Sequence, residues 1–231
     1  MKVVRYCMLI VLYHYSFSLN AARLPSISMP SFIMADGMNS QWVAKNFFYN
    51  GYPMTIQKFT SSKLSEDLLA FYKNKWRSSG YGIQEVGLIG EAYNIGYEEN
   101  EYSFSIQAEN TSYGSLGTLV VTKNKQYDLG PSMIPVHSDN KVLSRMHSLD
   151  NAVLSETLII NSLNSISLNQ RWYDTLLASD GWKLQSHYED LSSAVVIYQN
   201  NNRQCQITYA DANHAPGNKV VIMIHCIQGI T

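Results

Sequence analysis

Two stretches of the sequence, FYKNKWRSSGY at residues 71–81 and WYDTLLASDGW at residues 172–182, share aromatic and glycine positions at a separation of 101 residues. The same separation aligns Tyr97 with Tyr198 and residues 119–121 with residues 220–222. The matches keep one register without gaps from residue 50 to residue 122, and such self-similarity is the signature of an internal repeat. The sequence therefore predicts two copies of one unit.

Each copy is expected to contain one helix. Apolar residues at helical spacing follow Ser65 in the first copy and Ser167 in the second, and both serines are expected N-caps. Gln170, three residues after Ser167, completes a capping box. Gly80 and Gly181 are the expected helix stops.

The remaining segments of each copy have the composition of strands. Asn50-Gly51 is a strong hairpin signal, which predicts paired strands at about residues 42–49 and 53–60. Three strand-like runs follow each helix: about residues 83–89, 92–97 with 102–108, and 118–123 in the first copy, and about residues 182–188, 194–199 with 204–210, and 219–226 in the second. We therefore expect an α+β fold of two tandem strand–helix–antiparallel meander units, about β(β)αβββ each, with one helix packed on each antiparallel sheet.

The chain also divides by composition. Lys2 and Arg5 precede a mostly apolar run at residues 6–17, and small residues follow, which predicts a signal peptide at residues 1–21 with cleavage after Ala21. A dozen apolar residues are too few to span a bilayer as a helix. An N-terminal arm at residues 22–41, a first repeat at 42–125, a linker at 126–150 and a second repeat at 151–231 are expected to follow. The product is expected to be secreted or periplasmic, with no transmembrane segment in the mature chain.

The cysteines that remain after cleavage, Cys205 and Cys226, are predicted to form a disulfide. If they lie opposite each other, the hairpin turn falls between Ala215 and Pro216, where turn residues occur independently. That register aligns residues 205, 207 and 209 with residues 226, 224 and 222 on one apolar face. An exporting route leads to compartments where disulfides persist. The alternative is two buried free thiols.

Several chemistries are disfavoured by the sequence. The chain of 231 residues has a formal net charge of −1, or −3 without residues 1–21, and it lacks the basic stripe that phosphate binding needs. The predicted disulfide would consume both candidate thiol nucleophiles. Gly114-Ser115-Leu116-Gly117 has the wrong spacing for a serine-hydrolase elbow. No histidine or cysteine pair has metal-ligand spacing, so neither a metal nor another cofactor is expected.

The tyrosine content is high, with 16 tyrosines in the chain. Most aromatic residues of the repeated unit fall at core positions. Those in or near turns and the linker are candidates for recognition, because rigid amphipathic rings can anchor a protein or stack on a sugar. These candidates are Tyr49, Tyr52, Tyr93, Tyr113 and Tyr127.

Three classes of function remain open. The first is a non-catalytic exported protein that binds another protein in an envelope, secretion or surface assembly, or as a secreted effector. The second is a protein that binds a glycan or small ligand in a groove between the repeats. The third is an enzyme whose carboxylates or tyrosines converge only in three dimensions. The lack of a reactive motif favours the first class.

Overall fold

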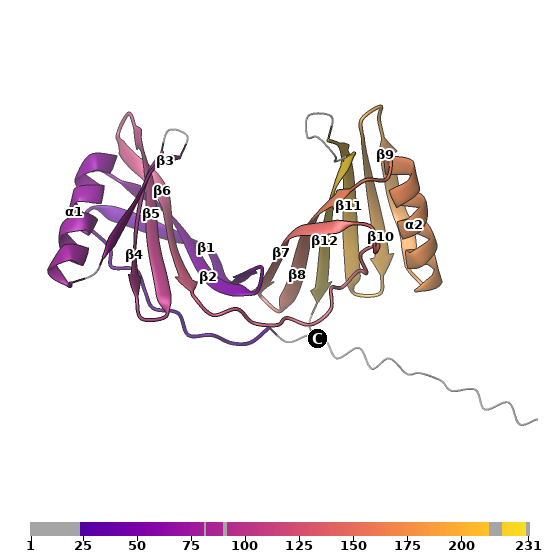
Figure 1. The fold of residues 1–231 in the computed structure, drawn as a ribbon, viewed down its shortest axis with the longest axis horizontal. Helices are drawn as coiled ribbons and strands as arrows, with labels where there is room; N and C mark the ends of the chain where they lie inside the picture. The colour runs from indigo at the N-terminus through magenta and orange to yellow at the C-terminus, as the bar shows by residue number, and fades with distance from the viewer. Residues whose placement is uncertain (1–23, 81, 90–91, 213–218, 230–231) are drawn as a thin grey trace, which may run out of the picture.

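The computed structural model describes residues 24–80, 82–89, 92–212 and 219–229, which form a two-armed arch (Figure 1). The first arm contains β1 (Met38–Tyr49), β2 (Tyr52–Ser61), α1 (Ser65–Ser78), β3 (Ile83–Ile89), β4 (Ala92–Glu99), β5 (Tyr102–Thr111) and β6 (Gly114–Lys123). The second arm contains β7 (Lys141–Asp150), β8 (Val153–Ser162), α2 (Ile166–Ser179), β9 (Lys183–Glu189), β10 (Ser193–Asn200), β11 (Arg203–Asp211) and β12 (Val220–Gly229). The order of elements in the first arm therefore recurs in the second.

All twelve strands belong to one antiparallel sheet, in the order β3-β4-β5-β6-β2-β1-β7-β8-β12-β11-β10-β9. The prediction of two tandem units, each a separate sheet under its own helix, is therefore wrong. With two helices of 14 residues each, the molecule is mainly sheet. The boundaries given for the signal peptide fall outside the described residues, and independent folding of the two repeats stays a prediction.

Strands β1 and β7 join the arms. They pair antiparallel at three positions, Phe47 with Ser148, Phe48 with His147 and Tyr49 with Met146. Their pairing joins the arms into one sheet but covers only three residues of each strand edge. Residues 141–150, which the sequence placed in the linker, form β7. Its sequence, KVLSRMHSLD, lacks a simple alternation of apolar and polar residues, and it was missed for that reason.

The helices cover only one face of the sheet, the outer face of the arch (Figure 1). Phe104 and Ile106 pack beneath α1, and Ile207 and Tyr209 belong to the matching core beneath α2. The segment before β1 contributes Phe32 to the first core. The linker before β7 contributes to the second core in the same way. We call the opposite, uncovered face of the sheet the inner face.

The helix starts differ from those predicted. Helix α1 begins at Ser65 itself, and the side chain of its N-cap residue, Leu64, accepts no hydrogen bond. The Ser65 N–H instead donates to Oδ1 of Asn110 on β5, at 2.7 Å. A residue distant in sequence therefore supplies the capping group.

For α2 the predicted cap was misplaced by two residues. Ser165, and not Ser167, is the N-cap, and its Oγ accepts the Leu168 N–H at 3.3 Å. Gln170 does not complete a capping box, because its Nε2 lies 3.1 Å from Nε2 of His187 on β9.

The predicted β11–β12 register is confirmed. Cys205 pairs with Cys226, Ile207 with Ile224 and Tyr209 with Ile222. The two Sγ atoms are 2.07 Å apart, which is the distance of a disulfide, and both cysteines are buried. The turn expected at residues 215–216 lies outside the described residues.

Every register shift in the sheet falls in a strand pair that contains β1, β3, β7 or β9. Strands β3 and β9 are the outer edges of the sheet. Strands β1 and β7 pair with each other over three residues only, so most of their facing edges have no strand partner in the described part of the chain. Bulges in edge strands disfavour the pairing of a further strand.

Candidate functional site

The inner face is an uncovered surface that spans both arms. Tyr49 faces Tyr52 on β2 and Met146 on β7, while Phe47 faces Met54. These five residues form what we call the floor patch, at the point where the arms meet. Tyr49 and Tyr52 are 43 % and 38 % exposed, and the other three are half-buried. Neighbouring apolar groups that stay accessible on a folded surface are candidates for an interaction site.

Aliphatic and hydroxyl side chains extend this surface into the second arm. Met146 pairs with Thr157 on β8. Further along β8, Ile159 pairs with Met223 on β12, which in turn pairs with Thr208 on β11. All five side chains are half-buried, since no helix covers this face. An antiparallel sheet normally presents a polar face to water, so a face this rich in methionine and isoleucine is unusual.

The five tyrosines predicted for recognition do not converge. Tyr49 and Tyr52 lie side by side in the floor patch. Tyr127 packs edge-on against Phe48, on the outer side, with the ring centroids 6.4 Å apart. Tyr93 and Tyr113 lie in the first arm away from the floor patch, where Tyr113 is 93 % exposed in the β5–β6 turn. Whether any of them binds a partner stays a prediction.

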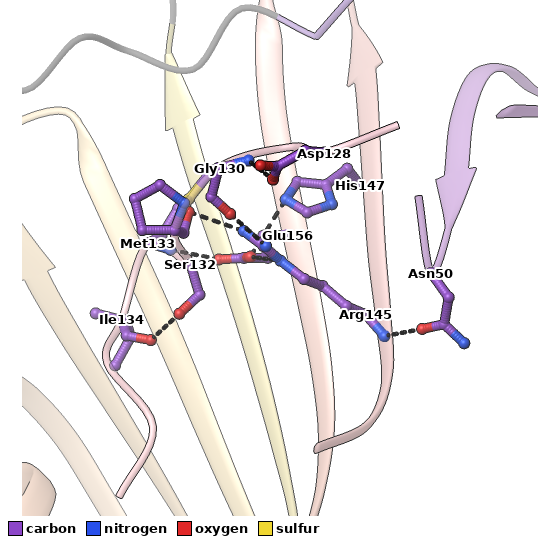
Figure 2. Close-up of polar contacts among 10 residues, drawn as sticks. Asn50, Asp128, Gly130, Ser132, Met133, Ile134, Arg145, His147 and Glu156 are labelled. Carbon is purple, nitrogen blue, oxygen red and sulfur yellow. Dashed lines mark hydrogen bonds and ion pairs between the residues drawn. The ribbon is translucent and has the colours of Figure 1, made fainter. Parts of the chain in front are cut away.

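A buried ionic cluster lies on the outer face near the junction of the arms (Figure 2). Glu156 of β8 is 2 % exposed. Its Oε1 accepts hydrogen bonds from Arg145 Nε at 2.6 Å and from His147 Nε2 at 3.2 Å. Its Oε2 accepts the Met133 N–H at 2.6 Å, which ties the linker to the sheet.

The other nitrogens of Arg145 bind the linker. Its Nη1 donates to the Gly130 carbonyl at 2.6 Å and its Nη2 to the Pro131 carbonyl at 2.8 Å. Its backbone N–H donates to Oδ1 of Asn50 at 2.8 Å, and the Asn50 N–H donates to the Arg145 carbonyl at 2.8 Å. Arg145 thus joins Glu156 and the linker through its guanidinium, and the β1–β2 turn through its backbone.

The cluster holds the fold together and is not arranged for catalysis. Burial raises the pKa of Glu156, but the hydrogen bonds from His147 and Met133 and the charge of Arg145 outweigh it, so the pKa lies below its ordinary value. The carboxylate is therefore ionised and fully engaged. His147 is 5 % exposed, so a substrate could reach neither His147 nor Glu156.

Two buried tyrosines in the cores carry phenols with raised pKa values. The phenol of Tyr72 in the first core has its pKa raised to about 12 by burial, and burial raises that of Tyr173 further. Such phenols stay protonated and cannot act as bases at neutral pH. No group of three or more histidine, cysteine or acidic side chains among the described residues could hold a metal ion.

Two surface grooves adjoin the linker. The larger, about 600 Å³, lies beside the β1–β2 turn and is lined by Tyr127, Leu143 and Arg145 among others. The smaller, about 450 Å³, lies between the linker and α2 and is lined by His137, Trp172 and other residues. Both grooves lie outside the floor patch. The larger groove is bordered by Arg145 of the ionic cluster.

The sequence contained a signal for Glu156 that was not used. In VLSETLIINS of β8, the alternate positions Leu154, Leu158 and Ile160 are buried, and Glu156 occupies the same series. A charge at a core position of a strand predicts a buried partner. The partner, Arg145, could not be found in the same way because β7 itself was missed. Of the floor patch, only Met146 lies on β7 and was missed for the same reason, whereas Tyr49 and Tyr52 were among the predicted recognition residues.

Comparison with known proteins gives no match: no family model, no curated protein and no solved structure is significantly similar to this chain. No helix among the described residues is long and apolar enough to cross a membrane.

Proposed function

We propose that this protein is an exported, non-catalytic protein that binds another protein through its inner face, as part of an envelope, secretion or surface assembly or as a secreted effector. The observation that carries the proposal is the uncovered floor patch. Apolar side chains exposed at this density on a folded surface are favourable to bury against a partner, at about 25 cal/mol per Å².

Export is supported by two features. Residues 1–21 have the pattern of a signal peptide, and Cys205 and Cys226 lie at disulfide distance. We propose a secreted or periplasmic location on these grounds. The direct check is the mass of the protein recovered from its producing cells, since cleavage after Ala21 leaves a chain that starts at Ala22.

A glycan or small ligand is the second candidate, and the groove of about 600 Å³ beside Tyr127 favours it. The groove lies where the arms meet, as ligand sites between repeated units often do. Much of its polar lining is already engaged, because Arg145 and Asn50 bond each other and the linker. We therefore rank this candidate below protein binding.

The proposed function is tested by site-specific photo-crosslinking in the producing cells. A photoreactive phenylalanine analogue replaces Tyr52 in the floor patch, and a matched variant carries it at Leu168, which is 52 % exposed on the outer helix α2. We expect one discrete protein adduct at residue 52 and none at residue 168. Equal adducts at both positions, or none at residue 52, would contradict protein binding by the inner face.

A further inference from the structure

We propose that the smaller groove, between the linker and α2, is a binding site for a neutral pyranose sugar, with Trp172 as its apolar wall. Helix α2 lies on the outer side of the second arm, so this groove is separate from the floor patch (Figure 1). It is also distinct from the larger groove beside Tyr127. The inference goes beyond the proposed function and does not depend on it.

Two aromatic rings form one corner of the groove. His137 of the linker and Trp172 of α2 both line it, with their ring centroids 5.0 Å apart and their planes at 75°. Rings this close to perpendicular present the face of one beside the edge of the other. Trp172 is partly exposed, although it also packs against the second core. The negative face of an aromatic ring attracts weakly positive C–H groups, such as those of a sugar ring.

Polar side chains with free hydrogen-bonding capacity line the same groove. Asn164 and Arg171 bond through their backbones, since the Asn164 carbonyl accepts from Asn169 and the Arg171 carbonyl accepts from Thr175. Within the described part of the chain, no hydrogen bond or ion pair engages the Asn164 carboxamide or the Arg171 guanidinium. The side chain of Asp139 is 69 % exposed at this groove. These groups can therefore bind a ligand without giving up a contact within the protein.

The donors and acceptors of the groove match the hydroxyl groups of a sugar. Nδ1 of His137 accepts the Asp139 N–H at 3.2 Å, so the neutral ring carries its proton on Nε2. Oδ2 of Asp139 lies 3.8 Å from that Nδ1, which is too far for a hydrogen bond, and its Oδ1 accepts from Ser138 at 3.3 Å. The groove thus offers N–H donors from His137, Asn164 and Arg171, and carboxylate oxygens from Asp139. One positive and one negative charge favour a ligand without net charge.

A buried amide holds the two walls of the groove together. Asn169 is 3 % exposed, and its Nδ2 donates to the carbonyls of Asn164 and Ser165 at 3.2 and 2.9 Å. Its Oδ1 accepts from Nδ2 of Asn140 in the linker at 3.3 Å. The Asn140 N–H in turn donates to the His137 carbonyl at 2.9 Å. Because the walls are fixed before a ligand arrives, binding costs less ordering of the protein.

The first repeat has a different chemistry at the aligned positions. The separation of 101 residues aligns Asn169 with Leu68, which is buried in the first core, and Arg171 with Ala70. Helix α1 nevertheless has the same length as α2. Packing a helix on this sheet therefore does not require an asparagine or an arginine at these positions, and a ligand gives them a role.

Other small ligands fit the groove less well. An apolar ligand would bury the polar groups without partners, which costs free energy. A phosphate or sulfate would meet the Asp139 carboxylate as well as the Arg171 guanidinium. The volume of about 450 Å³ lies within the range of small-ligand sites.

The test uses the oxidised mature chain, residues 22–231, and the methyl glycosides of glucose, galactose, mannose and N-acetylglucosamine. Binding is measured by saturation-transfer difference NMR, titrated to give a dissociation constant. We expect at least one glycoside to bind with a millimolar dissociation constant. Each sugar is also offered at the non-reducing end of a linear trisaccharide. Tighter binding of the trisaccharide would assign the site to a glycan chain, and equal binding would assign it to a free sugar.

Matched variants locate the binding. Trp172→Ala and Arg171→Ala should each weaken it at least tenfold. Arg171 is exposed, so its variant tests the site even if loss of the indole disturbs the core. Trp42→Ala is the control, because Trp42 is 47 % exposed on β1 and does not line the groove, and it should bind as the wild type does. Circular dichroism and the melting temperature check that each variant is folded.

The outcomes separate this inference from the proposed function. Failure of all four glycosides to bind, wild-type binding by Arg171→Ala, or an equal loss in Trp42→Ala and Trp172→Ala would each overturn the sugar site. The crosslink at residue 52 reports on the floor patch alone. A missing sugar site would therefore leave protein binding by the inner face intact, and a missing crosslink would leave the sugar site intact.

Discussion

Replacing Glu156 by glutamine should destabilise the protein strongly, because this carboxylate is the centre of the ionic cluster. It is 2 % exposed and binds Arg145, His147 and the Met133 N–H. The amide keeps the shape but loses the charge and presents N–H groups to donors. Removing one partner from a buried ion pair costs about 3–5 kcal/mol. For a chain of this size, that predicts a melting temperature lower by roughly 6–20 °C.

The pH dependence gives an independent check on Glu156→Gln. The pKa of Glu156 is lowered in the folded protein, so its contribution to stability is complete above the unfolded pKa of about 4.3. This contribution disappears as the pH falls through the lower folded pKa. The wild type should therefore lose more stability than the variant between about pH 5 and pH 3, and the two melting temperatures should converge.

The assay is thermal unfolding followed by circular dichroism at pH 7, 5, 4 and 3. Glu189→Gln is the matched control, since Glu189 lies 52 % exposed beside His187 and such a surface pair is worth under about 1 kcal/mol. A shift below 2 °C for Glu156→Gln at pH 7, or a difference from the wild type that does not change with pH, would refute a stabilising buried charge.

Three further substitutions test the fold. Cys205→Ser should cost about 3 kcal/mol under oxidising conditions, by the chain-entropy estimate for a loop of this size, and nothing in excess reductant; equal melting curves in both conditions would contradict the disulfide. Asn110→Ala removes the acceptor of the Ser65 N–H and should cost about 1 kcal/mol, measured by urea unfolding, while an unchanged midpoint would show that water replaces the cap. Gly117→Ala would place a Cβ 1.9 Å from the Gln107 carbonyl oxygen, so we expect a loss on the order of 4 kcal/mol and little folded protein, whereas a wild-type yield and melting temperature would contradict this close packing.

Local patterns in the sequence identified most of the elements correctly. The Asn50-Gly51 signal marks the β1–β2 turn, where both residues have positive φ. Gly181 also has positive φ just beyond α2, as its expected role as a helix stop requires. The β11–β12 register followed from cysteine spacing and a turn signal. These features depend on residues that are close along the chain or pair in a hairpin, so the sequence determines them directly.

The tertiary structure decided how the arms are joined and where the site lies. The junction rests on three residue pairs between β1 and β7, about 100 residues apart, and on Arg145 as it binds Glu156, Asn50 and the linker. No local sequence pattern predicts such contacts, because the sequence of an edge strand is the same whether the strand pairs within its own repeat or with the other repeat. This pairing adds Met146 to the floor patch, beside Tyr49 of the β1–β2 hairpin. The sequence therefore determined the units, and long-range pairing of their edges made one sheet and one candidate binding surface from them.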